Sequence, residues 1–223
     1  MKIAMIHGQN HKGTTCRVGR MLAKKLIGEV KEFFLPKDFG EYCVGCTTCF
    51  MKNETKCPHY EKLKPLTDAI TEADVIILTS PVYVFHATGS MKAWLDHYGY
   101  QWMVHRPNPA MFQKQAVCIA TAAGAGMKSA CKDMADSLFF WGIPKIYTCG
   151  FAVFATSYRE VSEKKRREID RKTTRIAAKI KSNAGKVKPG FKTKAFFHLM
   201  RIMNKKGGLN PADREYYKRM GWI

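Results

Sequence analysis

The chain has 223 residues, of which 46% are apolar, and 38 basic against 18 acidic residues give it a formal net charge of +20. This length and apolar content provide one substantial core plus an appendage. The apolar run at residues 1–6 is too short for a signal peptide, and no stretch approaches the roughly 18 apolar residues of a membrane-spanning helix. We therefore expect neither feature, and we expect a cytoplasmic location.

Short apolar runs alternate with segments of helical periodicity along most of the chain. The apolar runs predict five strands, at residues 2–6, 30–35, 75–80, 116–120 and 145–149. Apolar spacing predicts helices at residues 15–26, 63–74, 127–141 and about 162–182. This alternation predicts an open parallel α/β sheet with right-handed crossovers. A basic Gly/Pro linker at 185–190 then leads to an amphipathic helix at 191–203.

The loop after the first strand reads Gly8-Gln9-Asn10-His11-Lys12-Gly13-Thr14-Thr15. It combines turn glycines, hydroxyls and an imidazole with the start of a helix, where backbone N–H groups bind phosphates. The loop matches neither G-x-G-x-x-G nor G-x-x-x-x-G-K-[ST], which disfavours a dinucleotide fold and a P-loop. We predict a phosphate-binding loop, with a simple turn and helix cap as the alternative.

The next loop holds four of the eight cysteines in a C-x2-C-x2-C-x7-C run: Cys43, Cys46, Cys49 and Cys57, within residues 41–60. The first three share the spacing of bacterial ferredoxins. Four interpretations are open: a [4Fe–4S] cluster, a four-thiolate zinc site, a redox-active thiol pair, or free cysteines. We favour the cluster, because zinc sites usually pair two separated C-x2-C units and a reducing compartment disfavours disulfides. The other four, Cys16, Cys118, Cys131 and Cys149, are expected in the core.

Two further loops follow predicted strands. Residues 80–96 place Tyr83 and Phe85 where a planar ring could stack, and residues 121–126 have almost no side chains, so a flat ligand could approach the backbone. Ligands of open parallel sheets bind beyond the carboxyl ends of the strands. Together with the first loop, these segments predict a cofactor site. Tight strand–helix packing is the alternative role of the small residues at 121–126.

On these motifs, the chain resembles the flavodoxin-like NAD(P)H-dependent FMN reductases, and specifically their iron–sulfur flavoprotein branch. That family has a G-S-x-R-x-x-G-N-T loop, for which this chain has residues 8–15. Its S-P-V-Y…G…K…D stretch is matched by Ser80, Pro81, Val82, Tyr83, Gly89, Lys92 and Asp96. The resemblance covers residues 1–180, places the cysteine run where the branch has its compact motif, and extends to a Gly221-Trp222 ending.

The resemblance implies a flavodoxin-like α/β domain at 1–184, with a five-stranded sheet in the order 2-1-3-4-5 and helices on both faces, followed by a basic arm at 185–223. It also implies FMN as cofactor, NAD(P)H as co-substrate, and a quinone, flavin, metal or protein as electron acceptor. The implied FMN contacts are Gly8, Gln9, His11, Gly13, Thr14, Thr15, Pro81, Val82, Tyr83, Val84, Phe85, Thr121, Ala122, Ala123, Gly124 and Gly126. No catalytic side chain is expected, because the flavin carries the chemistry.

The chain departs from the family motif at three of the implied phosphate contacts. Gln9, His11 and Thr14 stand where the family has serine, arginine and asparagine. We therefore expect weaker or more pH-dependent phosphate binding.

The basic charge is concentrated at residues 159–206, which hold 17 basic and 4 acidic residues. A solvated helix face is the simple interpretation, but such a region also suits an anionic substrate, an anionic membrane, nucleic acid or an acidic protein such as ferredoxin. The amphipathic segment 191–203 suits a membrane surface or a second subunit. We favour a homodimer or homotetramer and do not expect nucleic acid.

Two alternative functions are kept. One is an iron–sulfur electron carrier that works with ferredoxin. The other is a basic membrane- or nucleic-acid-binding protein built on the same scaffold.

Overall fold

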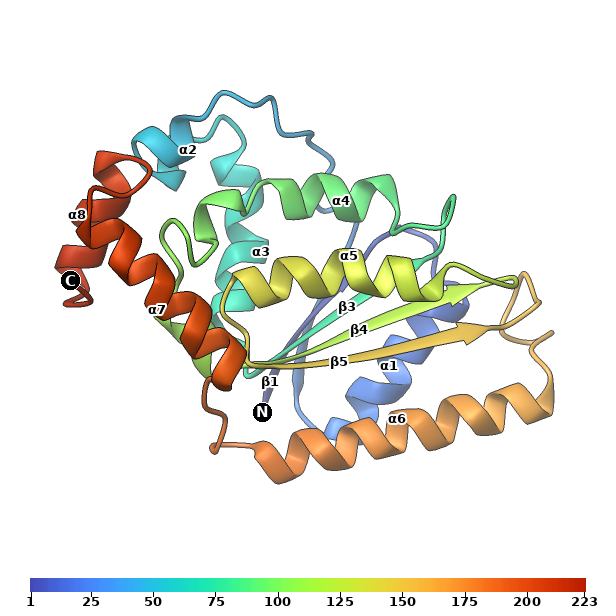
Figure 1. The fold of residues 1–223 in the computed structure, drawn as a ribbon. Coiled ribbons are helices and arrows are strands. Elements are labelled where there is room, and N and C mark those ends of the chain that lie inside the picture. The colour runs from blue at the N-terminus through green and yellow to red at the C-terminus, as the bar shows by residue number, and fades with distance from the viewer.

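Five parallel strands form one sheet in the order β2-β1-β3-β4-β5 in the computed structural model, which describes residues 1–223 (Figure 1). Their bounds are β1 Lys2–His7, β2 Glu29–Phe34, β3 Val75–Pro81, β4 Gln115–Ala122 and β5 Lys145–Ala152. The strand order reverses at β1, since β2 lies on one side of it and β3 on the other. The predicted fold class and strand order are confirmed.

The central strands are the most apolar because both of their faces are covered. In β3 every residue from Val75 to Ser80 is buried, and its register pairs Leu78 with Ile6 of β1 and Cys118 of β4. The edge strand β2 instead contains Glu29, Lys31 and Glu32, and none of its residues is buried. Charged side chains on an edge strand discourage pairing with another chain.

Helices cover both faces of the sheet. On one face α1 (Thr14–Leu26) and α6 (Glu163–Asn183) enclose a core of 18 buried residues. On the other, α3 (Tyr60–Glu72), α4 (Gly89–Asp96) and α5 (Met127–Phe140) enclose a core of 27 buried residues. All four scattered cysteines, Cys16, Cys118, Cys131 and Cys149, are buried as predicted.

The cysteine segment and the C-terminal arm lie together at the amino end of the sheet, away from the tips of the strand arrows (Figure 1). The cysteine segment contains α2 (Thr48–Met51) and a 3-10 turn at Glu54–Lys56, and the arm contains α7 (Phe191–Lys205) and α8 (Pro211–Arg219). Two more short 3-10 helices, at Gly99–Gln101 and Pro109–Gln113, precede β4. None of the helices combines the length and apolar composition needed to cross a membrane.

Candidate functional site

The first loop leaves β1 at its carboxyl end and is held against the β3 side of the sheet. The Gly8 N–H donates to the Thr79 carbonyl at 2.7 Å, and the Thr88 hydroxyl donates to the Gly8 carbonyl. A Cβ at Gly8 would lie 2.7 Å from Thr88 Oγ1, so only glycine fits this junction. The start of α1 is therefore fixed directly beside the loop that follows β3.

The amino end of α1 has free hydrogen-bonding capacity. Its N-cap is Gly13, which has no side chain to accept from the first-turn N–H groups. The Thr14 Oγ1 atom is buried and has no hydrogen-bond partner in the protein. A buried hydroxyl beside unpaired helix N–H groups fits an anionic group such as a phosphate.

The second loop makes a tight turn in which Tyr83 and His86 exchange both backbone hydrogen bonds at 3.0 Å. Its central residues, Val84 and Phe85, have φ angles of 48° and 65°, a left-handed conformation that is unusual for a β-branched residue. Val84 is 93% exposed and Phe85 is exposed as well. Strain and exposed apolar surface on one turn are typical of a ligand-binding loop.

Direct contacts join the three loops. The Tyr83 hydroxyl donates to Gln9 Oε1 at 2.6 Å, and the Thr15 and Thr121 hydroxyls lie 2.6 Å apart. At Gly126, where φ is 89°, a Cβ would lie 2.6 Å from Val82 Cγ1 and 3.0 Å from Phe85 Cα. The structure thus brings the three predicted loops together at one edge of the sheet.

The sequence interpretation missed a residue at the end of β5. Phe154 has a φ angle of 47° and is 76% exposed, and its N–H donates to the Ala123 carbonyl at 3.1 Å. Its ring lies 3.7 Å from the position of a Cβ at Gly124. The position just beyond the last strand was the available signal, because that strand ends at the same edge as the three loops.

The four clustered cysteines remain as thiols near one another but not tightly packed. Burial, and then repulsion from the thiolates of the other three, raise the pKa of Cys49, whereas hydrogen bonds from Thr48 lower the pKa of Cys46. No three of the four sulfurs lie within 4.8 Å of one another. Four thiols on one short segment form a donor set that fits an iron–sulfur cluster or a zinc ion.

A histidine pair adjoins the last of these cysteines. Cys57, His59 and His97 offer ligand atoms within 4.8 Å of one another. Because the His97 Nδ1 lies 2.8 Å from the Ala93 carbonyl and donates to it, its Nε2 accepts from His59 Nδ1 at 2.9 Å. His59 is half-buried and stands at the start of α3 without capping it through its side chain. His97, distant in sequence, gave no signal.

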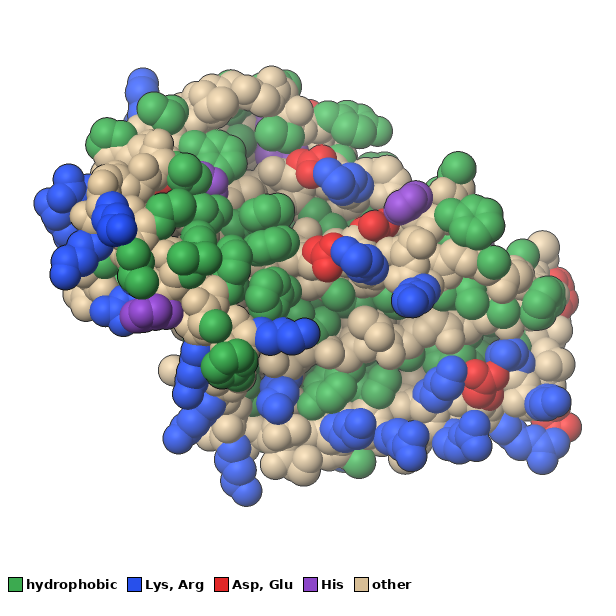
Figure 2. Space-filling view, viewed as in Figure 1, with side chains coloured by type: hydrophobic (Ala, Val, Ile, Leu, Met, Phe, Trp, Pro, Cys, Tyr) green, Lys and Arg blue, Asp and Glu red, His purple; other side chains and the backbone are tan.

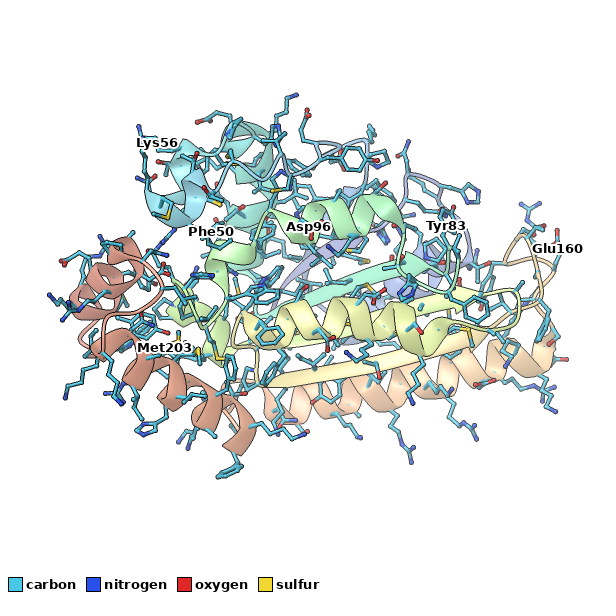
Figure 3. All side chains as sticks on the ribbon, turned by 45° about the horizontal axis from the view of Figure 1, so that its top comes forward. Phe50, Lys56, Tyr83, Asp96, Glu160 and Met203 are labelled. Carbon is cyan, nitrogen blue, oxygen red and sulfur yellow. The ribbon has the colours of Figure 1, made fainter.

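Figure 3 shows that the cysteine segment lies apart from the second of the three loops. Phe50, next to Cys49, and Tyr83 lie on opposite sides of Asp96 of α4 in this view.

A doubly wound sheet with open loops at its β1/β3 switch point is the architecture of flavodoxin-like FMN-binding proteins. Residues 1–156 match the family model of NADPH-dependent FMN reductases. The chain is 29% identical over 200 residues to an iron–sulfur flavoprotein of Archaeoglobus fulgidus, covering 87% of this chain and 86% of that protein. It is 28% identical over 180 residues to one of Clostridioides difficile, covering 77% and 76%. A solved flavone reductase superposes with a TM-score of 0.60 at 18% identity, over 85% of this chain and 66% of that one, which supports the fold.

The chain belongs to the NADPH-dependent FMN reductase family, and its similarity to iron–sulfur flavoproteins extends over most of its length. It is therefore an NAD(P)H-dependent oxidoreductase that uses FMN.

Proposed function

We propose that the three loops bind FMN, with the phosphate at the start of α1 and the ring system between residues 82–85 and 121–126. The observation that carries this placement is the buried, unpartnered Thr14 hydroxyl at the uncapped helix start. Bound FMN supplies the capacity to accept hydride from a nicotinamide and to release electrons to an acceptor. The contacts expected from the sequence, Gly8, Gln9, His11, Gly13, Thr14 and Thr15, form the loop that leads into this helix start and its first residues.

The side chains of this site bind and orient, and none is needed to move a proton. Gln9 is held by the Tyr83 hydroxyl, which fixes the second loop over the first. Pro81, Val82, Val84 and Phe85 offer apolar surface on one side, while Ala122, Ala123, Gly124 and Gly126 leave their backbone accessible, with Thr121 held by Thr15. We add Phe154 as a further ring contact, because its side chain stands exposed beside this backbone.

Substitution of Thr14 tests the placement. Thr14→Val removes the free hydroxyl without changing side-chain volume, and FMN affinity should fall about tenfold, which corresponds to roughly 1.4 kcal/mol for one hydrogen bond to a charged group. The matched control is Thr173→Val on α6, whose buried hydroxyl donates to the Ile169 carbonyl of its own helix. Fluorescence titration of the apoprotein with FMN measures both, and equal affinities would refute the placement.

We propose further that Cys43, Cys46, Cys49 and Cys57 bind a [4Fe–4S] cluster. Their C-x2-C-x2-C-x7-C spacing on one short segment supports this. Anaerobic purification with iron, sulfide and zinc analysis should give about four irons per chain. One zinc would instead favour a site at Cys57, His59 and His97, and metal-free protein with full FMN would leave the flavin function alone.

The electron donor and acceptor are addressed by stopped-flow mixing. Prompt bleaching of the flavin by NADPH or NADH supports turnover toward a quinone, flavin, metal or protein acceptor. No bleaching by either, with rapid reduction by ferredoxin, would support the alternative of an electron carrier, which the cysteines favour. The proposed flavin loops and the cysteines lie apart within one chain. We therefore propose a homodimer or homotetramer, in which electrons would pass between the cysteines of one copy and the flavin loops of another.

A further inference from the structure

A buried charge network joins the C-terminal arm to the cysteine segment. Asp213, on the first turn of α8, is 0% exposed, and its Oδ1 accepts from Arg106 Nη1 at 2.7 Å. Its Oδ2 accepts from His105 Nδ1 at 2.7 Å and from Asn210 Nδ2 at 2.6 Å. Each oxygen of this buried carboxylate is therefore paired, and Arg106 is held in one orientation from the α8 side.

The same guanidinium reaches the cysteine segment. Arg106 Nη2 donates to the carbonyl of Cys49, and Nη1 donates to the carbonyl of Phe50 at 3.0 Å. Both carbonyls belong to α2, a helix of only four residues that cannot pair its own last carbonyls. Arg106 thus supplies hydrogen bonds that the helix itself cannot, at the residue that carries one of the four thiols.

We propose that Asp213 and Arg106 form a positioning clamp that fixes the backbone of Cys49 for metal binding, so that α8 is part of the cluster site. This inference rests on the proposed cluster. Arginine suits the role because its planar fork can bond a carboxylate and backbone carbonyls at once, whereas a lysine ammonium is a point charge without that geometry. The guanidinium also places a fixed positive charge beside a site that gathers thiolates.

The C-terminal arm also docks through contacts that do not involve Arg106. The arm already packs through aromatic contacts of Tyr217 and Trp222 with Phe197, with ring centroids 4.9 to 6.0 Å apart. The Tyr217 and Tyr216 hydroxyls donate to the carbonyls of Met103 and Pro107. The contacts of Arg106 with Cys49 and Phe50 extend this network beyond the arm to the backbone of the cysteine segment.

The test compares four full-length proteins after anaerobic reconstitution: wild type, Arg106→Lys, the double variant Arg106→Met with Asp213→Asn, and Arg20→Lys. The double variant removes both buried charges together, which avoids leaving an unpaired one. Arg20→Lys is the matched control, since Arg20 makes a two-bond fork to Glu32 far from the cysteines. Thermal midpoint and FMN content report folding, and iron per FMN, the rate of iron loss to a chelator and the cluster potential report the clamp.

We expect Arg106→Lys and the double variant to lose iron to the chelator about tenfold faster than wild type, as is usual when a partner that orients a metal ligand is removed. The double variant, which lacks the positive charge, should also have a lower cluster potential. Arg20→Lys should match wild type. Iron retention equal to wild type in a folded double variant overturns the clamp and leaves the proposed function standing. A wild-type protein that takes up FMN but no iron overturns the proposed cluster and the clamp with it.

Discussion

Glycine at position 126 is the residue on which the shape of the proposed flavin site depends most directly. Its φ of 89° and the 2.6 Å approach to Val82 both exclude a side chain. Gly126→Ala should therefore push the second and third loops apart and weaken FMN binding by at least about tenfold, a loss of roughly 1.4 kcal/mol. FMN titration measures this loss.

Gly185→Ala separates the effect of the close approach from that of backbone strain. Gly185 also has a positive φ, 69°, but nothing lies within 4 Å of its Cβ position. Both substitutions should cost about 1–2 kcal/mol of unfolding free energy through the left-handed backbone, and only Gly126→Ala should affect FMN. A similar loss of affinity in both variants would assign the effect to strain alone.

We expect the buried His7, at the end of β1, to make the folded protein less stable in acid. Burial lowers its pKa, although its ring pairs with Glu32 at 2.8 Å and Thr79 at 2.7 Å. Unfolded chains bind the proton near pH 6.5 and the native protein only below that. This contribution to stability is therefore present above about pH 6.5 and is lost as the pH falls.

His7→Gln tests this prediction through the change of stability with pH. The variant should be less stable than wild type at pH 7, but its urea midpoint should fall less between pH 7 and pH 5. A slope equal to that of wild type would show that other groups, such as Glu32, govern acid stability.

At the scale of elements, α7 presents an apolar stripe to solvent. Phe191 is 86% exposed, and Leu199 and Ile202 are exposed too, while Thr193, Met200 and Asn204 form the buried side. In Figure 2 green side chains gather over α7 and the neighbouring end of α5, with lysines and arginines around them. The helix was predicted correctly. Phe196 and Phe197 pack on their own chain, whereas Phe191, Leu199 and Ile202 remain exposed.

We predict that this stripe is covered by a second copy of the chain. Leu199→Glu with Ile202→Glu should lower the mass measured by light scattering to that of one chain, because paired carboxylates would be buried without partners. Ile27→Glu, an exposed apolar site on α1, is the control. Unchanged mass together with lost binding to anionic vesicles would support a membrane role instead.

The sequence predicted best the elements that are buried on both faces. The continuous apolar run of β3 requires burial on both faces, and the strand order followed from recognising the fold. The cysteine segment was expected to lack regular structure, yet it contains α2 and a 3-10 turn. The last carbonyls of α2 accept hydrogen bonds from Arg106, which is distant in sequence. Helix α8 was missed although Asn210 and Pro211 supply a helix start, since its polar composition hides its periodicity.

The same limit applies to the candidate site. Each loop could be identified from its position after a strand, and the structure brings all three together. The contacts between Gln9 and Tyr83, or between His59 and His97, join residues 74 and 38 positions apart. Such pairings depend on the packing of whole elements, and neither periodicity nor spacing encodes them.

For the whole molecule, the dominant property is a charge of +20, much of it along α6, where blue side chains line the lower edge in Figure 2. Such a field attracts anionic substrates from a distance. We predict that the second-order rate constant for flavin reduction falls on the order of tenfold as salt rises and screens this field. The decrease should be steeper for NADPH than for NADH, since NADPH carries an additional phosphate.

Stopped-flow reduction at several salt concentrations with both nucleotides measures these two slopes, and the less charged NADH serves as the matched control for general effects of salt on the protein. Equal slopes would mean that salt acts on folding or on FMN retention and not on approach of the nucleotide. Rates independent of salt would mean that the basic charge along α6 and the arm serves a different partner, for which an acidic electron-transfer protein is the complementary choice.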